Sequence, residues 1–189
     1  MAVTAGQVKE LRERTGAGMM ECKKALEVTG GDMQRAIEEL RKTGRAKADK
    51  KAGRVAAEGV VIIQTTADGK QGVMLEINSE TDFVARHPDF QAFVSLVADS
   101  ALESKQEDLT QIAIIEESRQ NLIAKLGENI IARRAVYYAL GKNILGHYIH
   151  HGSKIGVMVE MTGGEEAVAK DIAMHIAASK PEFISMDQV

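Results

Sequence analysis

The 189-residue sequence lacks three features that would each point to a class of protein. Its single cysteine, Cys22, excludes an internal disulfide and a thiolate zinc cluster, and a lone thiol is more often a buried small side chain than a reactive one. No apolar run approaches the roughly 20 residues of a membrane span, and the charged N-terminus does not resemble a signal peptide. The net charge of −3 gives no general field for nucleic acid or an anionic membrane. We therefore expect a folded, cytoplasmic protein with neither a membrane nor a nucleic-acid partner.

Motifs of nucleotide binding and covalent chemistry are also missing. The sequence contains no phosphate-binding G-x-x-x-x-G-K-[ST], no G-x-S-x-G nucleophile elbow and no H-E-x-x-H zinc motif. His147, His150 and His151 are close in sequence, but in a strand His150 would face away from the other two. An interfacial or loop-lining role is therefore favoured over a metal site. These absences predict a protein that is not an enzyme and holds no cofactor, nucleotide or metal.

Residues 4–42 contain three short helical patterns, with Thr4 and Asp32 as N-cap residues of the first and the third. The segments TGAG and TGG lie between the patterns, and their glycines suit helix C-caps and tight turns. We expect a compact three-helix module over residues 1–42. Because a module of this size has a thin core and spare apolar surface, it is more typical of a docking unit than of an enzyme.

Met19 and Met20 begin the second helical pattern. Both could be core residues, yet adjacent positions of a helix cannot both point inward from a thin bundle. At least one of them is therefore expected on the surface, where the flexible thioether suits adaptable contacts.

Residues 43–58 have a helical pattern rich in Lys and Arg. With the residue before it, the segment carries six basic residues: Lys42, Arg45, Lys47, Lys50, Lys51 and Arg54. Two interpretations are open, a solvated helical linker and a basic patch for nucleic acid. The absence of interleaved aromatic residues and the acidic balance of the whole chain favour the linker.

From residue 59 the pattern becomes strand-like and then repeats. We predict a hairpin around Asp68-Gly69, helices over residues 90–102 and 109–126, a third strand within residues 127–141, a second hairpin over residues 147–161 and a last helix over residues 165–179. The segments GVMLEI and GVMVEM share a pattern at an offset of 84 residues. The sequence therefore predicts an α+β protein, in which the three-helix module precedes a duplicated core of antiparallel hairpin-plus-helix units. Its subdomains are expected at residues 59–141 and 142–189.

The first repeat is longer than the second between its hairpin and its helix. The helices align at an offset of 79 residues, with Val97 opposite Ile176, so the first repeat holds five extra residues. They fall within SETDFVARHPDF, residues 79–90, where Asp82 and Phe83 stand side by side. A large apolar ring is unusual in a loop, whose backbone must stay wetted. Either Phe83 packs under its own helix, or it is left available to a partner.

Two signature segments and a shorter one give a resemblance to a known family. They are VKELRERTGAGMMECKKAL at residues 8–26, TDFVA at residues 81–85 and ASKPEF at residues 178–183. Over essentially its whole length, the sequence resembles the bacterial translation elongation factor Ts family, the guanine-nucleotide exchange factors of elongation factor Tu.

The resemblance implies a set of contacts with elongation factor Tu. The three-helix module would have a ubiquitin-associated-type fold and dock on the nucleotide domain of the partner. The partner-binding residues that the resemblance implies are Arg12, Met19, Met20, Thr81, Asp82, Phe83, Val84 and His151. Phe83 resembles the family's wedge, which enters between helices of the partner. Asp82 would support the displacement that disturbs the Mg²⁺ site and loosens the phosphate-binding loop, so that GDP leaves without covalent chemistry.

The sequence departs from the family pattern in two places. His87-Pro88 follow the motif where relatives often carry small or polar residues, which predicts that the turn ends early. Many relatives also continue beyond Val189 into a helical hairpin, a closing strand and a C-terminal segment. The second subdomain is therefore expected to be incomplete, in a shortened or a naturally short form. In a short form, an unpaired sheet edge predicts pairing with another copy or with the partner.

Two functional alternatives stay open beside nucleotide exchange. In the first, the protein is a non-catalytic adaptor whose three-helix module binds a partner while the duplicated domain only presents it. In the second, the basic linker binds RNA.

Overall fold

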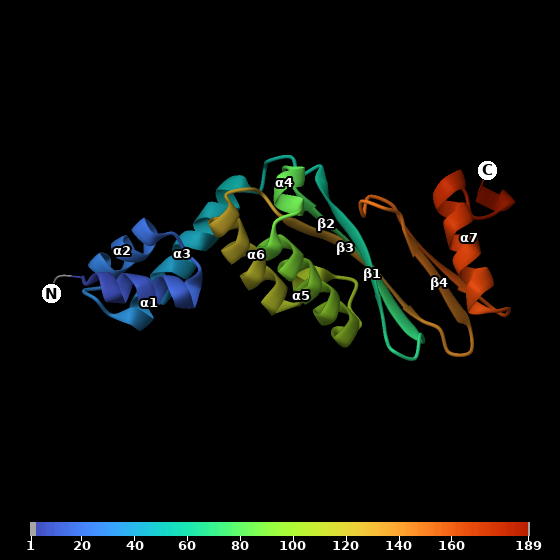
Figure 1. Cartoon of the computed structure of the whole chain (residues 1–189), viewed down its shortest axis with the longest axis horizontal. Helices are drawn as coiled ribbons and strands as arrows, with labels where there is room; N and C mark the ends of the chain where they lie inside the picture. Colours follow the sequence, from blue (N-terminus) through green and yellow to red (C-terminus); the bar gives the residue numbers. More distant parts are fainter. Residues whose placement is uncertain (1–2, 189) are drawn as a thin grey trace.

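The structure is a computed structural model that describes residues 3–188, and the molecule is elongated (Figure 1). Along its length lie a helical bundle, a three-stranded sheet covered by helices, and a two-stranded hairpin covered by a helix. Helices and antiparallel strands are combined in one chain, so the predicted α+β class is confirmed.

The elements occur in the following order. They are α1 (Ala5–Thr15), α2 (Met19–Val28), α3 (Met33–Lys51), β1 (Glu58–Thr65), β2 (Gln71–Ser79), α4 (Asp82–Ala85), α5 (Pro88–Ser104), η1 (Leu109–Gln111), α6 (Ala113–Leu126), β3 (Ile131–Ala139), β4 (Ile144–Ile149), β5 (Gly156–Met161), α7 (Glu166–Ser179) and η2 (Met186–Gln188).

The predicted three-helix module is present, with the expected caps. The Thr4 side chain accepts a hydrogen bond from the Gln7 backbone in a capping box, and the Asp32 side chain caps α3. Leu11 and Leu26 form the centre of a small core together with Cys22, which is fully buried. Burial raises the pKa of the Cys22 thiol, because the thiolate would be poorly solvated there. The prediction of a buried cysteine is confirmed.

Helix α3 is longer than the sequence pattern predicted. It continues through the expected end at residue 42 to Lys51, so the bundle and the basic segment share one helix. Gly44 and Ala48 are buried where α3 packs against α6, and a Cβ atom at Gly44 would lie 3.7 Å from the Cβ of Ala124. The segment is helical only as far as Lys51, so the prediction of a helix over residues 43–58 is confirmed in its first part and wrong in its second. The prediction that it is solvated is wrong on the face that contacts α6. The division of the chain into domains stays a prediction.

The first sheet has the strand order β1-β2-β3, and β2 supplies its core face. Val73, Leu75 and Ile77 alternate along β2 and are buried. They pack in one cluster with Phe90 and Val97 of α5, so this helix covers the sheet. The predicted hairpin turns at Asp68-Gly69, where Gly69 has a φ of 64°.

The two hairpins pack face to face, and their contacts are reciprocal. A Cβ atom at Gly72 would lie 3.4 Å from the sulfur of Met158. A Cβ atom at Gly156 would lie 3.4 Å from the sulfur of Met74. Both the glycines and the methionines are 84 residues apart, so the second contact repeats the first with the roles of the hairpins exchanged. The predicted duplicated core is confirmed.

The helices that follow the two hairpins also correspond. Their buried positions match at an offset of 79 residues: Phe90 with Ala169, Val94 with Ala173, and Ala98 with Ala177. The first repeat reaches its helix through α4, whereas the second passes from β5 to α7 without a helical turn. Therefore α4, which begins at Asp82, is the addition that distinguishes the first repeat.

Two other boundaries differ from the predictions. The helix expected over residues 109–126 is divided into η1 and α6, because Ile112 is extended and Asp108 caps a separate 3₁₀ turn. The second hairpin begins at Ile144 and its first strand ends at Ile149, so His150 and His151 lie in the turn. The alternation of strand side chains therefore does not apply to these two histidines.

The second sheet contains β4 and β5 alone within residues 3–188. Its strand β5 pairs with β4 on one edge and with no described strand on the other.

No helix within residues 3–188 is both long enough and apolar enough to cross a membrane.

Candidate functional site

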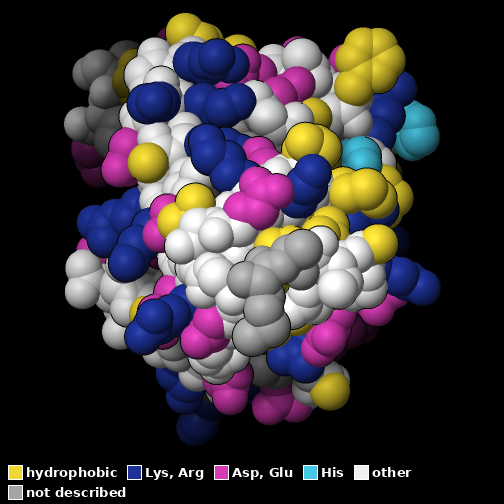
Figure 2. All heavy atoms as spheres, turned by 90° about the vertical axis from the view of Figure 1, so that its left-hand side faces the viewer, with side chains coloured by type: hydrophobic (Ala, Val, Ile, Leu, Met, Phe, Trp, Pro, Cys, Tyr) yellow, Lys and Arg dark blue, Asp and Glu magenta, His cyan; other side chains and the backbone are white. Residues whose placement is uncertain are grey.

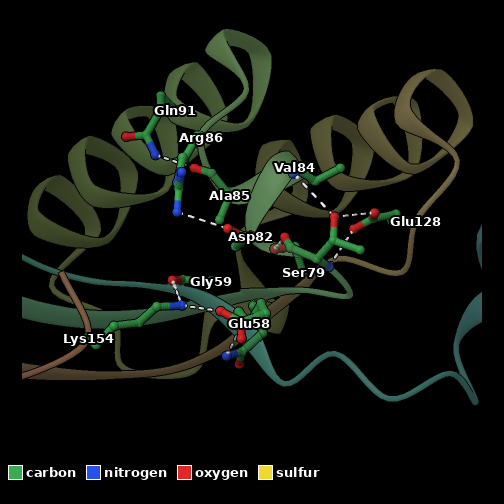
Figure 3. Close-up of polar contacts among 12 residues, drawn as sticks. Glu58, Gly59, Ser79, Asp82, Val84, Ala85, Arg86, Gln91, Glu128 and Lys154 are labelled. Carbon is green, nitrogen blue, oxygen red and sulfur yellow. Dashed lines mark hydrogen bonds and ion pairs between the residues drawn. The ribbon is translucent and has the colours of Figure 1, made fainter. Parts of the chain in front are cut away.

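Helix α4 is a single turn whose N-terminus is fixed by a long-range contact. The Thr81 hydroxyl caps the turn by accepting a hydrogen bond from the Val84 backbone at 3.4 Å. The Thr81 backbone N–H and hydroxyl both donate to the carboxylate of Glu128, at 2.9 and 2.6 Å (Figure 3). Glu128 precedes β3, so residues far apart in sequence hold the turn in place.

Two further hydrogen bonds join α4 to its neighbours. The Ser79 hydroxyl donates to the Thr81 carbonyl at 2.9 Å, where β2 ends. The Gln91 side chain of α5 donates to the Ala85 carbonyl at 2.6 Å (Figure 3). Polar contacts from three sides therefore anchor a turn that is too short to persist on its own.

The side chains of the turn divide by direction. Val84 packs against the core and Thr81 is half-buried. Phe83 is 81% exposed, and the Asp82 carboxylate lies at the surface, 2.8 Å from the Arg86 guanidinium. The alternative in which Phe83 packs under its own helix is therefore wrong. The structure instead presents an apolar ring and a carboxylate on a well-anchored turn.

The turn ends before His87-Pro88, and whether it ends earlier than in relatives stays a prediction. Helix α4 ends at Ala85, and His87-Pro88 begin α5 as its N-cap and first residue. The His87 Nδ1 accepts a hydrogen bond from the Asp89 backbone at 3.2 Å. This cap allows the chain to leave the exposed turn and enter the long helix within three residues.

Arg12, Met19 and Met20 are brought together on one face of the three-helix module. They line a shallow groove with Val8 and Lys23. Met19 is 57% exposed and Met20 is 71% exposed, which confirms that at least one of the pair lies on the surface. Figure 2 faces this end of the molecule, and its basic and acidic side chains are interspersed, with exposed hydrophobic side chains among them. The groove therefore combines an apolar lining with charged residues that are all basic, namely Lys9, Arg12 and Lys23.

His151 is exposed in the turn between β4 and β5. This turn is joined to the first sheet by a hydrogen bond from the Val61 backbone N–H to the Ser153 carbonyl at 2.7 Å. The Lys154 ammonium also pairs with Glu58 (Figure 3). The turn and α4 both lie along the upper side of the molecule in Figure 1.

The predicted site residues thus form three surfaces rather than one pocket. Within residues 3–188 no group of three or more His, Cys, Asp or Glu side chains could hold a metal ion. His147, His150 and His151 are all exposed, and the His150 Nδ1 lies 3.0 Å from the Tyr148 hydroxyl. Such an arrangement is suited to contact with a macromolecule.

Sequence reasoning missed two residues of the site. Arg86 could have been found, because Asp82 and Arg86 are four residues apart on a helical turn. Glu128 could not have been found, since it lies 47 residues from Thr81 and no local pattern connects them.

Comparison with known proteins gives consistent matches. The family model described as Elongation factor TS matches residues 80–189. The chain is 55% identical over 196 residues to Elongation factor Ts of Alkalilimnicola ehrlichii, and the alignment covers 100% of the chain and 67% of that relative. It is 56% identical over 190 residues to Elongation factor Ts of Yersinia pestis (strain Pestoides F), and this alignment covers 100% of the chain and 66% of the Yersinia protein. The chain therefore spans about two thirds of the length of these curated relatives.

Proposed function

Since the chain belongs to the elongation factor Ts family of translation elongation factors, we propose that it binds elongation factor Tu in the cytoplasm and promotes GDP release. One observation carries the mechanism: Phe83 is 81% exposed on an anchored turn that the second repeat lacks. A ring that is exposed in the free protein and buried in a complex contributes binding energy only in that complex. The turn is therefore suited to act on a partner.

In the proposed mechanism Phe83 enters between helices of the partner's nucleotide domain. Asp82, which lies beside Phe83, supports the displacement of these helices. The displacement disturbs the Mg²⁺ site of the partner and loosens its phosphate-binding loop. Thr81 and Val84 contribute by holding the turn, since both face inward. No covalent step is needed, because the exchange factor only changes the relative stability of the nucleotide-bound and nucleotide-free partner.

The energy of one ring is not sufficient for the proposed effect. Burial of a phenylalanine contributes roughly 1.5–3 kcal/mol, or some 10- to 100-fold in affinity. To lower the affinity of the partner for its nucleotide by about 10⁴-fold, the exchange factor needs about 5.5 kcal/mol of differential binding. The groove formed by Arg12, Met19 and Met20 and the turn that carries His151 must therefore also bind the partner.

The coupling between nucleotide and exchange factor is reciprocal. If the protein lowers the affinity of its partner for GDP, an incoming nucleotide lowers the affinity of the partner for the protein by the same factor. Nucleotide binding then releases the exchange factor for another cycle.

The proposal is tested with elongation factor Tu loaded with a fluorescent GDP. The wild-type protein is expected to accelerate release, and Phe83→Ala to lower the accelerated rate by about 10- to 100-fold. Phe183→Ala makes the same chemical change at a ring that is 47% exposed in the C-terminal segment, and should leave the rate unchanged. Because Phe83 makes little contact with its own domain, its variant should keep the wild-type melting temperature.

Other results would favour the alternatives. Binding of elongation factor Tu without faster release would indicate the adaptor. Salt-sensitive RNA binding without either activity would indicate the basic segment as the functional element.

We also propose that the second subdomain can pair with another copy of the chain. The outer edge of β5 supports this, because it presents backbone groups that no described strand satisfies. Sedimentation over a range of concentrations should reveal a dimer. Glu160→Pro, at an exposed position of the edge strand where the register directs the N–H away from β4, should shift the protein toward the monomer, because proline removes a backbone donor from the edge. A monomer of the wild type at every concentration would contradict the pairing.

A further inference from the structure

Residues 81–85, which comprise Thr81 and α4, are called the exchange turn below, and Glu128 contacts this turn with both oxygens of its carboxylate. Oε2 accepts from the Thr81 backbone N–H at 2.9 Å, and Oε1 accepts from the Thr81 hydroxyl at 2.6 Å. Because the hydroxyl hydrogen points to Glu128, an oxygen lone pair is left for the Val84 N–H. Glu128 therefore fixes the direction of the hydroxyl that caps α4 (Figure 3).

The segment that carries Glu128 also holds the end of α3. The Asn129 backbone N–H donates to the Glu80 carboxylate at 2.6 Å, and the Asn129 side chain, 1% exposed, donates to the Arg54 carbonyl at 2.8 Å. The Lys51 ammonium donates to the Gly127 carbonyl. Residues 127–129 thus lie between the C-terminal end of α3 and the strand end that leads into α4. Glu128 is held from both sides and can act as a fixed support.

The exposed turn needs such a support. Helix α4 has four residues, and the ring of Phe83 contributes almost no burial in the free protein. A single helical turn is not stable by itself, so its orientation has to come from contacts with the rest of the molecule. Charged hydrogen bonds are the stronger kind, and Glu128 supplies two of them.

We propose that Glu128 is a positioning residue for nucleotide exchange: it orients α4 so that Asp82 and Phe83 meet the partner in one arrangement. The inference rests on the proposed function. Without the Glu128 carboxylate the docking surfaces of the three-helix module and of the β4–β5 turn remain, but Phe83 no longer has a fixed direction. The maximal rate of GDP release should then fall, while the concentration of half-maximal effect should change little.

The test compares Glu128→Ala and Glu128→Gln with the wild type in GDP release from elongation factor Tu. Glu128→Ala should lower the maximal rate by about tenfold, the weight of one charged hydrogen bond, with less than about twofold change in the half-saturating concentration. Glu128→Gln keeps one acceptor oxygen and should lie between the two. Glu103→Gln is the matched control, because the Glu103 side chain is exposed and makes no hydrogen bond or ion pair with residues 3–188. A higher half-saturating concentration at an unchanged maximal rate would overturn the inference.

A second readout does not depend on the partner. Amide hydrogen exchange of Val84 and Ala85 in the free protein should accelerate at least tenfold in Glu128→Ala and stay unchanged in Glu103→Gln. If the wild type fails to accelerate GDP release, the proposed function fails, while faster amide exchange would still assign Glu128 the ordering of the turn. Unchanged amide exchange would overturn the inference in either case.

A third variant guards against a general loss of folding. Thr81→Val keeps the shape of the side chain but removes the hydroxyl that receives the support of Glu128. It should lower the maximal rate and accelerate amide exchange in the same direction as Glu128→Ala. Wild-type behaviour of Thr81→Val would contradict the positioning role.

Discussion

Single residues of the exchange turn differ in what they contact, and this determines how each should respond to substitution. Thr81 and Val84 face the protein, so changes there act on the geometry of the turn. Asp82 and Phe83 face outward, so changes there should act on contacts with the proposed partner and spare the fold. The Asp82–Arg86 pair is exposed and adds little stability, because solvent screens it.

The pH dependence of stability should reflect Asp89 at the start of α5. The hydrogen bond from the Lys125 ammonium, 2.7 Å away, lowers the pKa of Asp89 below its ordinary value. A carboxyl whose pKa is lower in the folded state stabilises the protein above its unfolded pKa of about 4 and loses that contribution as the pH falls through the folded value. The melting temperature of Asp89→Asn should therefore fall less steeply than that of the wild type below about pH 4.

Asp171→Asn is the control for this prediction. Asp171 lies exposed on α7 and makes no ion pair with residues 3–188, so its variant should follow the wild-type curve. Parallel curves for the wild type and Asp89→Asn between pH 5 and pH 3 would contradict the prediction.

The exposure of the outward residues was predictable, and the support beneath them was not. A phenylalanine in a loop that the second repeat omits has no role in the fold unit, which is why Phe83 could be expected outside. Adjacent methionines on a thin bundle gave the same kind of prediction for Met19 and Met20. The contact between Thr81 and Glu128 spans 47 residues and depends on how two loops meet, so no local pattern indicates it.

At the scale of elements, close backbone approach rather than side-chain volume determines how α7 sits on its hairpin. A Cβ atom at Gly146 of β4 would lie 2.2 Å from the carbonyl oxygen of Ala169. The buried residues of α7 include Ala169, Ala173 and Ala177, which are small enough for the helix to lie against the strand. The second repeat thus buries its helix with small residues, where the first uses Phe90 and Val94.

Gly146→Ala should therefore destabilise the second repeat. The added methyl group meets backbone that cannot move aside without displacing α7, and overpacking of this kind costs about 1–3 kcal/mol or more. Urea denaturation followed by circular dichroism measures the loss. Gly163→Ala is the matched control, because a Cβ atom there would meet nothing within 4 Å. Equal midpoints for the two variants would show that α7 does not pack as described.

Element types were predicted better than element ends. The caps at Thr4 and Asp32 and the glycine turns located the helices of the module, because these residues act locally. The burial of the helical segment after residue 42 against α6 was missed, since its contact face consists of Gly44 and Ala48, which contribute little to a hydrophobic pattern. The packing of small residues is decided by the partner helix and not by the sequence of one helix alone.

On the scale of the whole molecule, α3 connects the groove of the three-helix module with the part that carries α4. Its first half packs in the module, and its second half packs against α6. The loop at residues 127–129 then joins the end of α3 to the exchange turn. The two proposed contact surfaces are therefore parts of one continuous framework (Figure 1).

Insertions in α3 should test this framework. One Ala between Lys42 and Thr43 turns the module by about 100° and moves it by about 1.5 Å relative to the core. Affinity for elongation factor Tu should fall, while each part keeps its own core. Four inserted Ala residues restore the direction to within about 40° at a displacement of about 6 Å, and should weaken binding less than one does. Wild-type affinity in both variants would show that the module moves independently.

Helix α3 fixes the distance and orientation between the two proposed contact surfaces, which a flexible linker would not do. Two binding surfaces joined by a flexible linker can bind partners of many sizes. Two binding surfaces joined by one rigid helix bind only a partner whose complementary sites have the matching distance and relative orientation. Helix α3 thereby fixes the spacing that a partner has to match. If the proposed function holds, α3 would therefore select a partner by the distance and angle between its two contact sites before Phe83 acts on it.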